Sequence, residues 1–140
     1  MLIASWNVNS VKARLQNLLT WLEEAKPDIV ALQELKCVDE AFPRSEIEAL
    51  GYNIETFGQK TYNGVALLSR YRLEDIIRGI PGFDDEHSRY IEAVVSTPSG
   101  ALRVASLYLP NGNPVDSPKY PYKLAWMAAF EKHAEALMQN

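Results

Sequence analysis

At 140 residues the chain has the length of one domain that can bury a hydrophobic core, and its 47% hydrophobic and 23% charged content is ordinary for a globular protein. A formal net charge of −4 argues against loose, charge-driven binding to nucleic acid. No apolar run approaches the roughly 20 residues of a membrane span, and the first residues lack the basic start of a signal peptide. The single cysteine, Cys37, permits no intrachain disulfide. From these features we expect a cytoplasmic protein without a membrane span.

The first quarter of the chain has the pattern of a strand, a helix and a second strand. Residues 2–8 and 28–33 are short apolar runs typical of buried strands, and between them apolar residues recur at helical spacing. Those recurring residues are Val11, Leu15, Leu18, Leu19 and Leu22. Asn9 or Ser10 can cap this helix, and the pair Lys26-Pro27 ends it. Such a unit predicts an α/β fold.

The middle of the chain predicts a short helix and a series of strands. Ser45 and Glu48 have the spacing of a capping box, so we expect a helix that starts at Ser45 and ends at Gly51. Strands are then expected over residues 52–57, 64–69, 73–80, 90–96 and 101–109. The sequence Thr-Pro-Ser-Gly between the last two strands is a turn, so we expect those two strands to pair as a hairpin.

The last part of the chain predicts a loop followed by a helix. Residues 110–121 hold four prolines and are expected to form a loop. From residue 123 to the end the pattern is helical, with one apolar face. That face comprises Met127, Phe130, Ala134 and Leu137. Because His133 stands among charged neighbours, we expect it at the surface.

Polar residues follow the first two predicted strands. Asn7 ends the first strand, and Glu34, with Lys36 two residues on, ends the second. Each alone is typical of turn chemistry or of a solvated carboxylate at a strand exit. Together, at the ends of two strands joined by one helix, they can lie side by side. A carboxylate beside an amide suits Mg²⁺, which prefers oxygen ligands and usually takes one or two protein carboxylates.

A third polar element follows the last predicted strand, where Tyr108 precedes the sharp turn 110–112 (Pro-Asn-Gly). This segment fits either a half-buried tyrosine before an ordinary turn, or a phenol and an amide that donate hydrogen bonds to a phosphate oxygen. The sequence contains no glycine-rich phosphate loop, no zinc spacing of cysteine and histidine, and no nucleophile elbow. The acidic run 84–86 followed by His87 is expected to be a solvated loop.

In this order the three elements resemble the exonuclease III family of abasic-site endonucleases. That family belongs to the wider endonuclease/exonuclease/phosphatase superfamily, which also holds DNase I and inositol-phosphate phosphatases. The matching segments are 5–9 (SWNVN), 27–30 (PDIV), 32–36 (LQELK), 58–60 (GQK), 64–69 (GVALLS) and 108–112 (YLPNG). The Gln-Glu-x-Lys and Tyr-x-Pro-Asn-Gly segments are specific in combination, and GQK and GVALL favour the DNA-repair branch.

The resemblance implies roles for individual residues. Asn7, Glu34 and Tyr108 match the catalytic positions. Glu34 corresponds to the metal-binding carboxylate, Asn7 to the amide beside it at the metal position, and Tyr108 to the tyrosine on the scissile phosphate. Lys36 corresponds to the family's lysine that fixes the metal-binding glutamate. Asn9 also lies next to that glutamate in the family, at a position that is often Asp in relatives. The positions that contact the DNA backbone in the family are occupied by Lys12, Tyr62, Arg89 and Asn111.

The resemblance also implies a fold and an activity. The fold would be α/β and DNase I-like, with this chain as half of a four-layer α/β sandwich that has a mixed, largely antiparallel sheet and flanking helices. Residues 1–140 would be the amino-terminal part of a single domain. The parent enzyme would be a DNA-repair phosphodiesterase that uses Mg²⁺, or Mn²⁺ in its place. It would act on double-stranded DNA as an abasic-site endonuclease and as a 3′-5′ exonuclease or 3′-phosphodiesterase.

The family's Gly-Asp-x-Asn and Ser-Asp-His segments, which supply a water-preparing Asp and a phosphate-binding His, are absent from this sequence. We therefore expect the chain alone to be inactive. We also expect the second sheet to belong to the missing carboxy-terminal half, leaving the strand faces around Leu67 and Val104 open to that half or to a self-association partner. Two alternatives remain: a superfamily phosphatase acting on an inositol or other phosphate ester, and a non-catalytic module that binds DNA or a partner.

Overall fold

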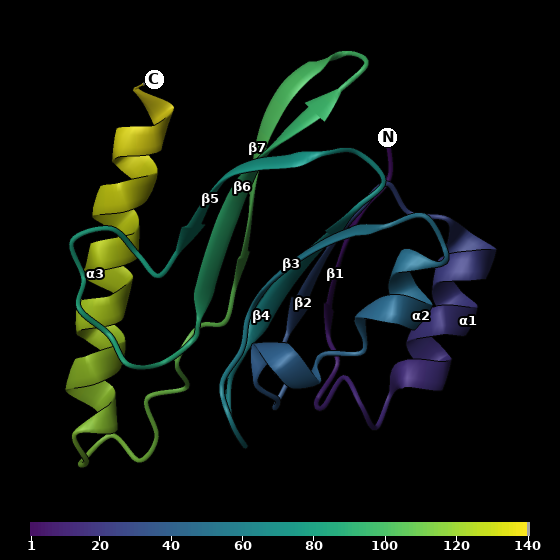
Figure 1. Cartoon of the computed structure of the whole chain (residues 1–140). Helices are drawn as coiled ribbons and strands as arrows, with labels where there is room; N and C mark the ends of the chain where they lie inside the picture. The colour runs from purple at the N-terminus through teal and green to yellow at the C-terminus, as the bar shows by residue number, and fades with distance from the viewer. Residues whose placement is uncertain (140) are drawn as a thin grey trace.

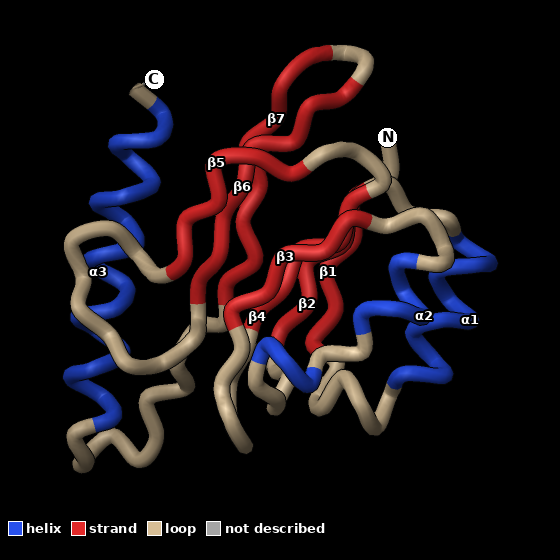
Figure 2. Tube along the Cα trace, viewed as in Figure 1, coloured by secondary structure: helices blue, strands red, loops and turns tan. Residues whose placement is uncertain are grey.

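The computed structural model describes residues 1–139 and contains two β-sheets packed face to face between helices (Figures 1 and 2). The larger sheet has the strand order β1-β2-β4-β3, and the smaller sheet has the order β5-β6-β7. The layers run helix, sheet, sheet, helix, so the α/β sandwich expected from the resemblance is confirmed. The last residue of the predicted final helix, Asn140, lies outside the described residues.

The larger sheet is mixed, with one parallel and two antiparallel pairings. β1 (Ile3–Asn7) runs parallel to β2 (Ile29–Gln33), and β4 (Val65–Ser69) pairs antiparallel with both β2 and β3 (Asn53–Phe57). β2 and β4 are central strands covered on both faces, which explains their unbroken apolar sequences. All four strands lie within a residue or two of the predicted ranges.

The smaller sheet is an antiparallel meander of β5 (Leu73–Arg78), β6 (Tyr90–Thr97) and β7 (Gly100–Leu107). β6 and β7 pair in continuous register along their whole length, so the predicted hairpin is confirmed. Its tip projects beyond the larger sheet at the top of Figure 1.

The core between the two sheets overturns one expectation. Leu67 on β4 is fully buried and packs with Ile91 and Ala93 on β6, while Val104 on β7 packs partly buried against the same cluster. The prediction that the faces around Leu67 and Val104 lie open was therefore wrong. The covering sheet is formed by residues 73–107 of this chain, which the sequence pattern had already marked as strands.

Two helices cover the outer face of the larger sheet. α1 (Leu15–Ala25) buries Leu18 and Leu22 against it, and Lys26 in left-handed conformation ends the helix as predicted. The predicted cap was wrong: α1 begins after Arg14 without a side-chain cap. The Ser10 hydroxyl instead accepts a hydrogen bond from the Ala13 backbone N–H (3.2 Å) in the turn that precedes the helix.

The second helix, α2 (Arg44–Glu48), is short, and its predicted capping box was also wrong. The N-cap position of α2 is Pro43, so Ser45 lies inside the helix, two residues after the position from which it could cap it. The Ser45 hydroxyl donates a hydrogen bond to the neighbouring Glu46 carboxylate (2.9 Å) instead.

α3 (Lys119–Met138) lies on the outer face of the smaller sheet. It begins four residues earlier than predicted and includes Pro121 in its first turn, where a missing N–H costs nothing. Trp126 is its buried centre, and Phe130 packs beside it. The predicted face was only partly right, because Met127 is exposed. Among the described helices, none is both long and apolar enough to cross a membrane.

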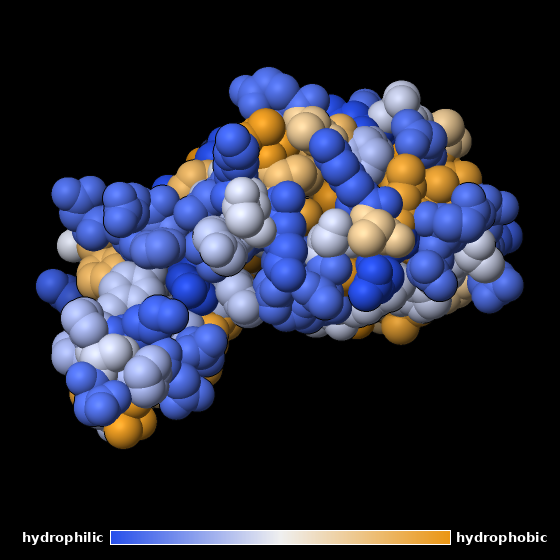
Figure 3. Space-filling view, turned by 90° about the horizontal axis from the view of Figure 1, so that it is seen from below, coloured by the Kyte–Doolittle hydropathy of each residue, from blue (hydrophilic) through white to orange (hydrophobic). Residues whose placement is uncertain are grey.

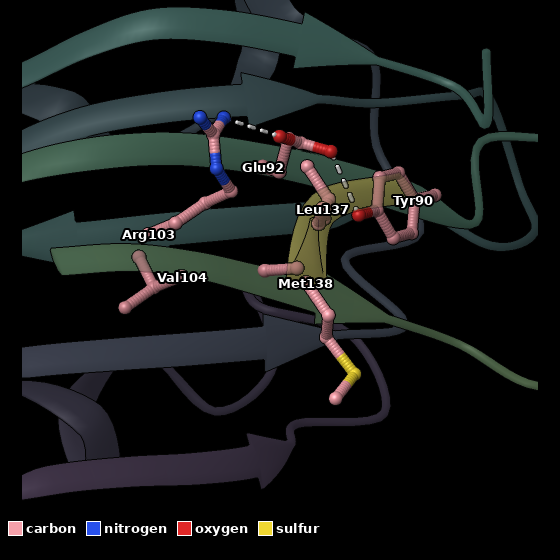
Figure 4. Close-up of a pocket in the computed structure, with 7 residues that line it drawn as sticks. Tyr90, Glu92, Arg103, Val104, Leu137 and Met138 are labelled. Atoms are coloured by element: carbon pink, nitrogen blue, oxygen red, sulfur yellow. Dashed lines mark hydrogen bonds and ion pairs between the residues drawn. The ribbon is translucent and has the colours of Figure 1, made fainter. Parts of the chain in front are cut away.

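A buried charged cluster fixes α3 to the smaller sheet. Glu92 on β6 is fully buried and accepts hydrogen bonds from the Tyr90 hydroxyl and from Arg103 Nη1, each at 2.9 Å, as Figure 4 shows. His133 on α3 is hydrogen-bonded to the same carboxylate, so its predicted surface position was wrong. Burial raises the pKa of Glu92, but the hydrogen bonds from His133, Tyr90 and Arg103 outweigh this and lower it.

Candidate active site

The parallel pairing of β1 and β2 brings Asn7 and Glu34 together. Asn7 lies opposite Gln33 in the strand register, and Glu34 follows directly, so both side chains emerge at the same edge of the sheet. The Asn7 amide donates a hydrogen bond to Glu34 Oε1 (2.8 Å). The juxtaposition predicted from the two strand ends is therefore present. This edge is seen from below in Figure 3, where hydrophilic residues cover much of the surface.

The backbone turns sharply at Glu34 to present its carboxylate. Glu34 and Lys36 both adopt left-handed conformations, with φ of 57° and 56°. Non-glycine residues seldom do so, and such strain concentrates at functional sites. The Leu35 N–H donates to the Gly64 carbonyl (3.1 Å), and a Cβ on Gly64 would lie only 2.9 Å from Leu35 Cβ. Gly64 therefore permits the close approach that holds the turn.

Tyr108 reaches this edge from the other sheet. It follows the end of β7, where its backbone N–H donates to the Arg89 carbonyl (2.8 Å), and its hydroxyl is hydrogen-bonded to Glu34. Burial, the hydrogen bond to Glu34 and the charge of Glu34 raise the pKa of Tyr108, although the Arg89 cation opposes them. The phenol is therefore held in its protonated, donating form.

The carboxylate of Glu34 is held ionised by its neighbours. Partial burial by itself raises the pKa of Glu34, but the hydrogen bonds from Asn7 and Tyr108 and the positive charge of Lys36 outweigh it, so the pKa is lowered. Lys36 Nζ lies 3.7 Å from Glu34 Oε2 and donates a shorter bond to Asn9 Oδ1 (2.6 Å). Lys36 thus lies beside the carboxylate and Asn9 beside Lys36, while the supporting roles that the resemblance implies for them stay predictions.

Two buried polar residues behind the site were not anticipated. Gln33 on β2 donates to Ser106 Oγ on β7 (3.1 Å), and Ser106 donates to the Leu32 carbonyl (2.7 Å). These bonds join the two sheets one residue before Glu34 and two residues before Tyr108. The signal in the sequence was a polar residue at the inner position of each strand end, which is costly in a core unless it is hydrogen-bonded.

The donor set fits a hard divalent cation, with Glu34 as its single carboxylate. Among residues 1–139 no group of three His, Cys, Asp or Glu side chains comes together, and Mg²⁺ needs only one or two protein carboxylates. Glu34 Oε2 lies 3.7 Å from Lys36 Nζ. Asn7 presents its NH₂ to Glu34, while its oxygen accepts from the Asn9 backbone N–H (3.1 Å). As arranged, Asn7 orients the carboxylate rather than offering a metal ligand.

The four residues expected to contact DNA lie on separate loops around this edge. Lys12 is exposed in the turn before α1, and Tyr62 is 68% exposed in the loop before β4. Asn111 is exposed, and its side-chain oxygen accepts from the Asn113 backbone N–H (2.8 Å). Arg89 is partly buried, with its guanidinium 4.9 Å from the Tyr108 ring centroid. Of these four, Arg89 is the one the structure joins directly to a predicted catalytic residue.

The loop at residues 84–87 is more ordered than the predicted solvated loop. Asp84 and Glu86 are exposed, but Asp85 accepts hydrogen bonds from the Tyr122 hydroxyl (2.7 Å) and from the His87 backbone N–H (3.0 Å). The imidazole of His87 packs beside the Tyr122 ring. The expectation was met for the exposed residues Asp84 and Glu86 but not for Asp85, because Tyr122, a distant residue on α3, supplies it with a hydrogen-bond partner.

The sequence profile of the Endonuclease/Exonuclease/phosphatase family matches residues 4–139. The chain belongs to this family. It is 37% identical over 137 residues to exodeoxyribonuclease III of Haemophilus influenzae, an alignment that covers 96% of this chain and 51% of that relative.

Solved structures of proteins named as nucleases have the same fold as this chain. The 3′-5′ exonuclease NExo of Neisseria meningitidis superposes with a TM-score of 0.94 at 40% identity, covering 100% of this chain and 54% of that one. A second NExo structure is described as a 3′ phosphatase bound to product DNA hairpin (TM-score 0.93, 40% identity, 99% and 52% covered). An AP endonuclease from Archaeoglobus fulgidus gives a TM-score of 0.88 at 36% identity, with 95% and 51% covered. The fold is therefore DNase I-like, as expected, and the chain spans about half the length of these relatives.

Proposed function

We propose that residues 1–140 are the amino-terminal part of one endonuclease/exonuclease/phosphatase domain, whose parent enzyme hydrolyses phosphodiester bonds in DNA repair. The observation that carries this proposal is the meeting of Asn7, Glu34 and Tyr108 at one edge of the sandwich. The chain aligns over nearly all of its length with relatives that are named as DNA nucleases. The finer proposal is an abasic-site endonuclease with 3′-5′ exonuclease or 3′-phosphodiesterase activity on double-stranded DNA.

In this proposal each residue at the edge has one task. Glu34, kept ionised, holds Mg²⁺, or Mn²⁺ in its place, through its carboxylate. Such an ion, when bound, polarises a phosphate and steadies the leaving oxygen. Asn7 fixes the carboxylate and Lys36 balances its charge. Tyr108, kept protonated, turns its hydroxyl from Glu34 to the scissile phosphate and stabilises the charge that develops there.

DNA is recognised in this proposal through its backbone and shape. Lys12, Tyr62, Arg89 and Asn111 surround the edge on separate loops and offer donors suited to phosphates. The net charge of −4 is compatible with a local basic rim and with sequence-independent shape recognition. A cytoplasmic location remains a prediction.

The water-activating carboxylate and a phosphate-binding histidine are proposed to come from the carboxy-terminal half. In this proposal the chain alone therefore does not cleave DNA. This division of the site also fits the finding that, among the described residues, no group of three His, Cys, Asp or Glu side chains comes together.

The test is a comparison of three substrates with the parent protein. We expect Mg²⁺-dependent incision of a duplex that carries one abasic site and removal of a 3′-terminal block, both abolished by EDTA, with no release of phosphate from an inositol phosphate. Hydrolysis of the inositol phosphate alone would favour the phosphatase alternative. DNA binding without any cleavage in Mg²⁺ or Mn²⁺ would favour a non-catalytic module.

A further inference from the structure

Gln59 lies in the loop between β3 and β4, and its side-chain oxygen joins that loop to the segment that leads into β6. Gln59 Oε1 accepts hydrogen bonds from Asn63 Nδ2 (3.1 Å) and from the Ser88 backbone N–H (2.8 Å). These two hydrogen bonds are named the Gln59 bridge. Asn63 belongs to the same loop of the larger sheet, whereas Ser88 precedes the central strand of the smaller sheet. The bridge therefore connects chain segments of the two sheets.

On the side of the larger sheet, the loop held by the bridge supports the turn at Glu34. The Asn63 carbonyl accepts a hydrogen bond from the Lys36 backbone N–H (2.9 Å), and the adjoining Gly64 carbonyl receives the residue between Glu34 and Lys36. Asn63 is only 6% exposed, and a buried amide needs hydrogen-bond partners. Gln59 supplies one of them. The direction of the two carbonyls that hold the Glu34 turn therefore depends on the bridge.

On the side of the smaller sheet, the bridge leads to Tyr108. Ser88 is buried and bonds the β3–β4 loop in two further ways. Its hydroxyl donates to the Gly58 carbonyl (3.1 Å), and its carbonyl accepts from the Gly64 N–H (2.9 Å). The next residue, Arg89, accepts a hydrogen bond from the Tyr108 backbone N–H (2.8 Å). The bridge thus ends one residue before the carbonyl that fixes the backbone of Tyr108.

The β3–β4 loop needs side-chain contacts to keep its shape. Thr61 and Asn63 both have positive φ, 72° and 57°. Non-glycine residues keep such conformations only where the surrounding structure determines them. The oxygen of Gln59 meets this need, because it receives a donor from within the loop and a donor from the opposite sheet at the same time.

We propose that Gln59 is a positioning residue, which sets the distance between the Glu34 carboxylate and the Tyr108 hydroxyl by holding their supporting segments together. The inference rests on the proposed function, in which these two groups act on one phosphate, and it assigns to Gln59 no contact with metal or DNA. A displacement of about 1 Å at a reacting group can cost about 10²-fold in rate. Loss of the bridge therefore slows the reaction without unfolding the protein.

The first experiment measures kcat and KM of the parent protein on a duplex with one abasic site. Gln59→Met keeps the length of the side chain and removes the accepting oxygen. We expect kcat to fall by about 10–100-fold while KM stays nearly constant, because the lost interaction acts in the transition state and not in binding. Gln16→Met is the matched control, since Gln16 is exposed on α1 and its amide bonds Thr20 of the same helix. An unchanged kcat in Gln59→Met would overturn the inference.

A second variant removes the other partner of the bridge. Asn63→Gly deletes the side chain and keeps the positive φ, which glycine adopts without strain. It should lower kcat in the same way, and the double variant with Gln59→Met should lie at most about twofold below Gln59→Met alone, as groups that share one hydrogen bond require. Fully multiplicative losses would show that the two residues act separately and would refute the bridge.

The Tyr108→Phe background separates positioning from general stabilisation. Gln59→Met should cost at most about a further twofold in kcat there, because the distance that Gln59 sets no longer has a phenol at one end. The same 10–100-fold loss in both backgrounds would show that Gln59 supports the fold at large, and would contradict its role as a positioning residue.

The closing experiment does not depend on catalysis. Hydrogen exchange at single-amide resolution should be faster in Gln59→Met at Lys36 and Tyr108, whose N–H groups bond the held segments, and unchanged within β2 (Ile29–Gln33). Faster exchange in a parent protein that cleaves no DNA would contradict the proposed function but support the bridge. Unchanged exchange at both amides, in a parent protein that does cleave DNA, would overturn the inference and leave the proposed function standing.

Discussion

Glu34 is the residue on which the proposed metal site depends. Glu34→Gln keeps the size of the side chain and removes its charge. We expect Mg²⁺-dependent cleavage by the parent enzyme to fall by about 10²–10³ or more, because the cation loses its anionic ligand. Glu24→Gln on the exposed face of α1 is the matched control. Circular dichroism should show an unchanged fold, and near-normal cleavage at low Mg²⁺ would contradict the assignment.

Tyr108 lowers the pKa of Glu34, and in the proposed mechanism it also contacts the scissile phosphate. Tyr108→Phe removes one of the hydrogen bonds that lower the pKa of Glu34, so that pKa should rise. The acid limb of the pH–rate profile should therefore move to higher pH, and kcat should fall with little change in KM. Initial rates from acid to neutral pH measure both. An acid limb that stays in place would show that the phenol does not act on the carboxylate.

The three central residues of the candidate site could be predicted because each ends a strand whose apolar run is visible in the sequence. Parallel pairing of β1 and β2 then placed Asn7 beside Glu34. The bonds of Gln33 and Ser106 could not be predicted, since they depend on how two sheets pack and not on local pattern. Nor could the left-handed turn at Glu34, because nothing in the residue type itself demands a positive φ.

At the scale of the elements, the docking of α3 depends on the buried carboxylate of Glu92. Its pKa is lowered in the folded protein, so its stabilising contribution is complete above the ordinary glutamate value of 4.5. That contribution is lost as the pH falls from there through the lowered folded pKa. Glu92→Gln should therefore reduce the free energy of unfolding at neutral pH by about 1.5–3 kcal/mol, and the difference from wild type should shrink in acid.

Urea unfolding followed by tryptophan fluorescence, at pH 7 and about pH 3.5, measures this difference. Glu131→Gln, an exposed carboxylate on α3, is the control that should show neither effect. A difference between Glu92→Gln and wild type that is the same at both pH values would exclude an ionised anchor.

The corrected start of α2 gives a second prediction for an element. A true capping serine replaced by alanine costs about 0.5–2 kcal/mol, whereas Ser45 lies inside the helix and bonds only its neighbour Glu46. Ser45→Ala should therefore change the free energy of unfolding by less than about 0.5 kcal/mol. A larger loss in urea unfolding would mean that Ser45 caps the helix after all.

Strands were easier to predict than helix ends and helix faces. The strand runs were bounded by turn residues. The capping box required the helix to begin after Ser45, but α2 already begins after Pro43. His133 was misplaced because its charged neighbours in the sequence point away from the sheet, whereas His133 follows Phe130 by one helical turn. Counting three or four residues at a time from Trp126 leads to Phe130 and then His133, and this spacing would have predicted that His133 faces the sheet.

At the scale of the whole molecule, one apolar groove stays open. It measures about 670 Å³ and lies between the end of β7 and α3, with Leu109, Leu124 and Met127 exposed along it. Apolar patches of this kind promote association. We expect the 140-residue chain to self-associate in light scattering, and Leu124→Lys with Met127→Lys to reduce its mass toward the monomer. We also expect it not to nick abasic duplex in Mg²⁺. A monomeric wild-type chain that nicks such DNA would refute both expectations.

The bonds between Gln33 and Ser106 have a consequence for how the proposed parent enzyme would lose its activity. Glu34 and Tyr108 follow strands of opposite sheets, and the hydrogen bonds of Gln33 and Ser106 join those two sheets next to them. A small shift of one sheet relative to the other would separate the Glu34 carboxylate from the Tyr108 hydroxyl before either sheet unfolded. Inactivation on warming should therefore precede the loss of secondary structure, and natural selection on catalysis would act on an interior contact that no substrate ever touches.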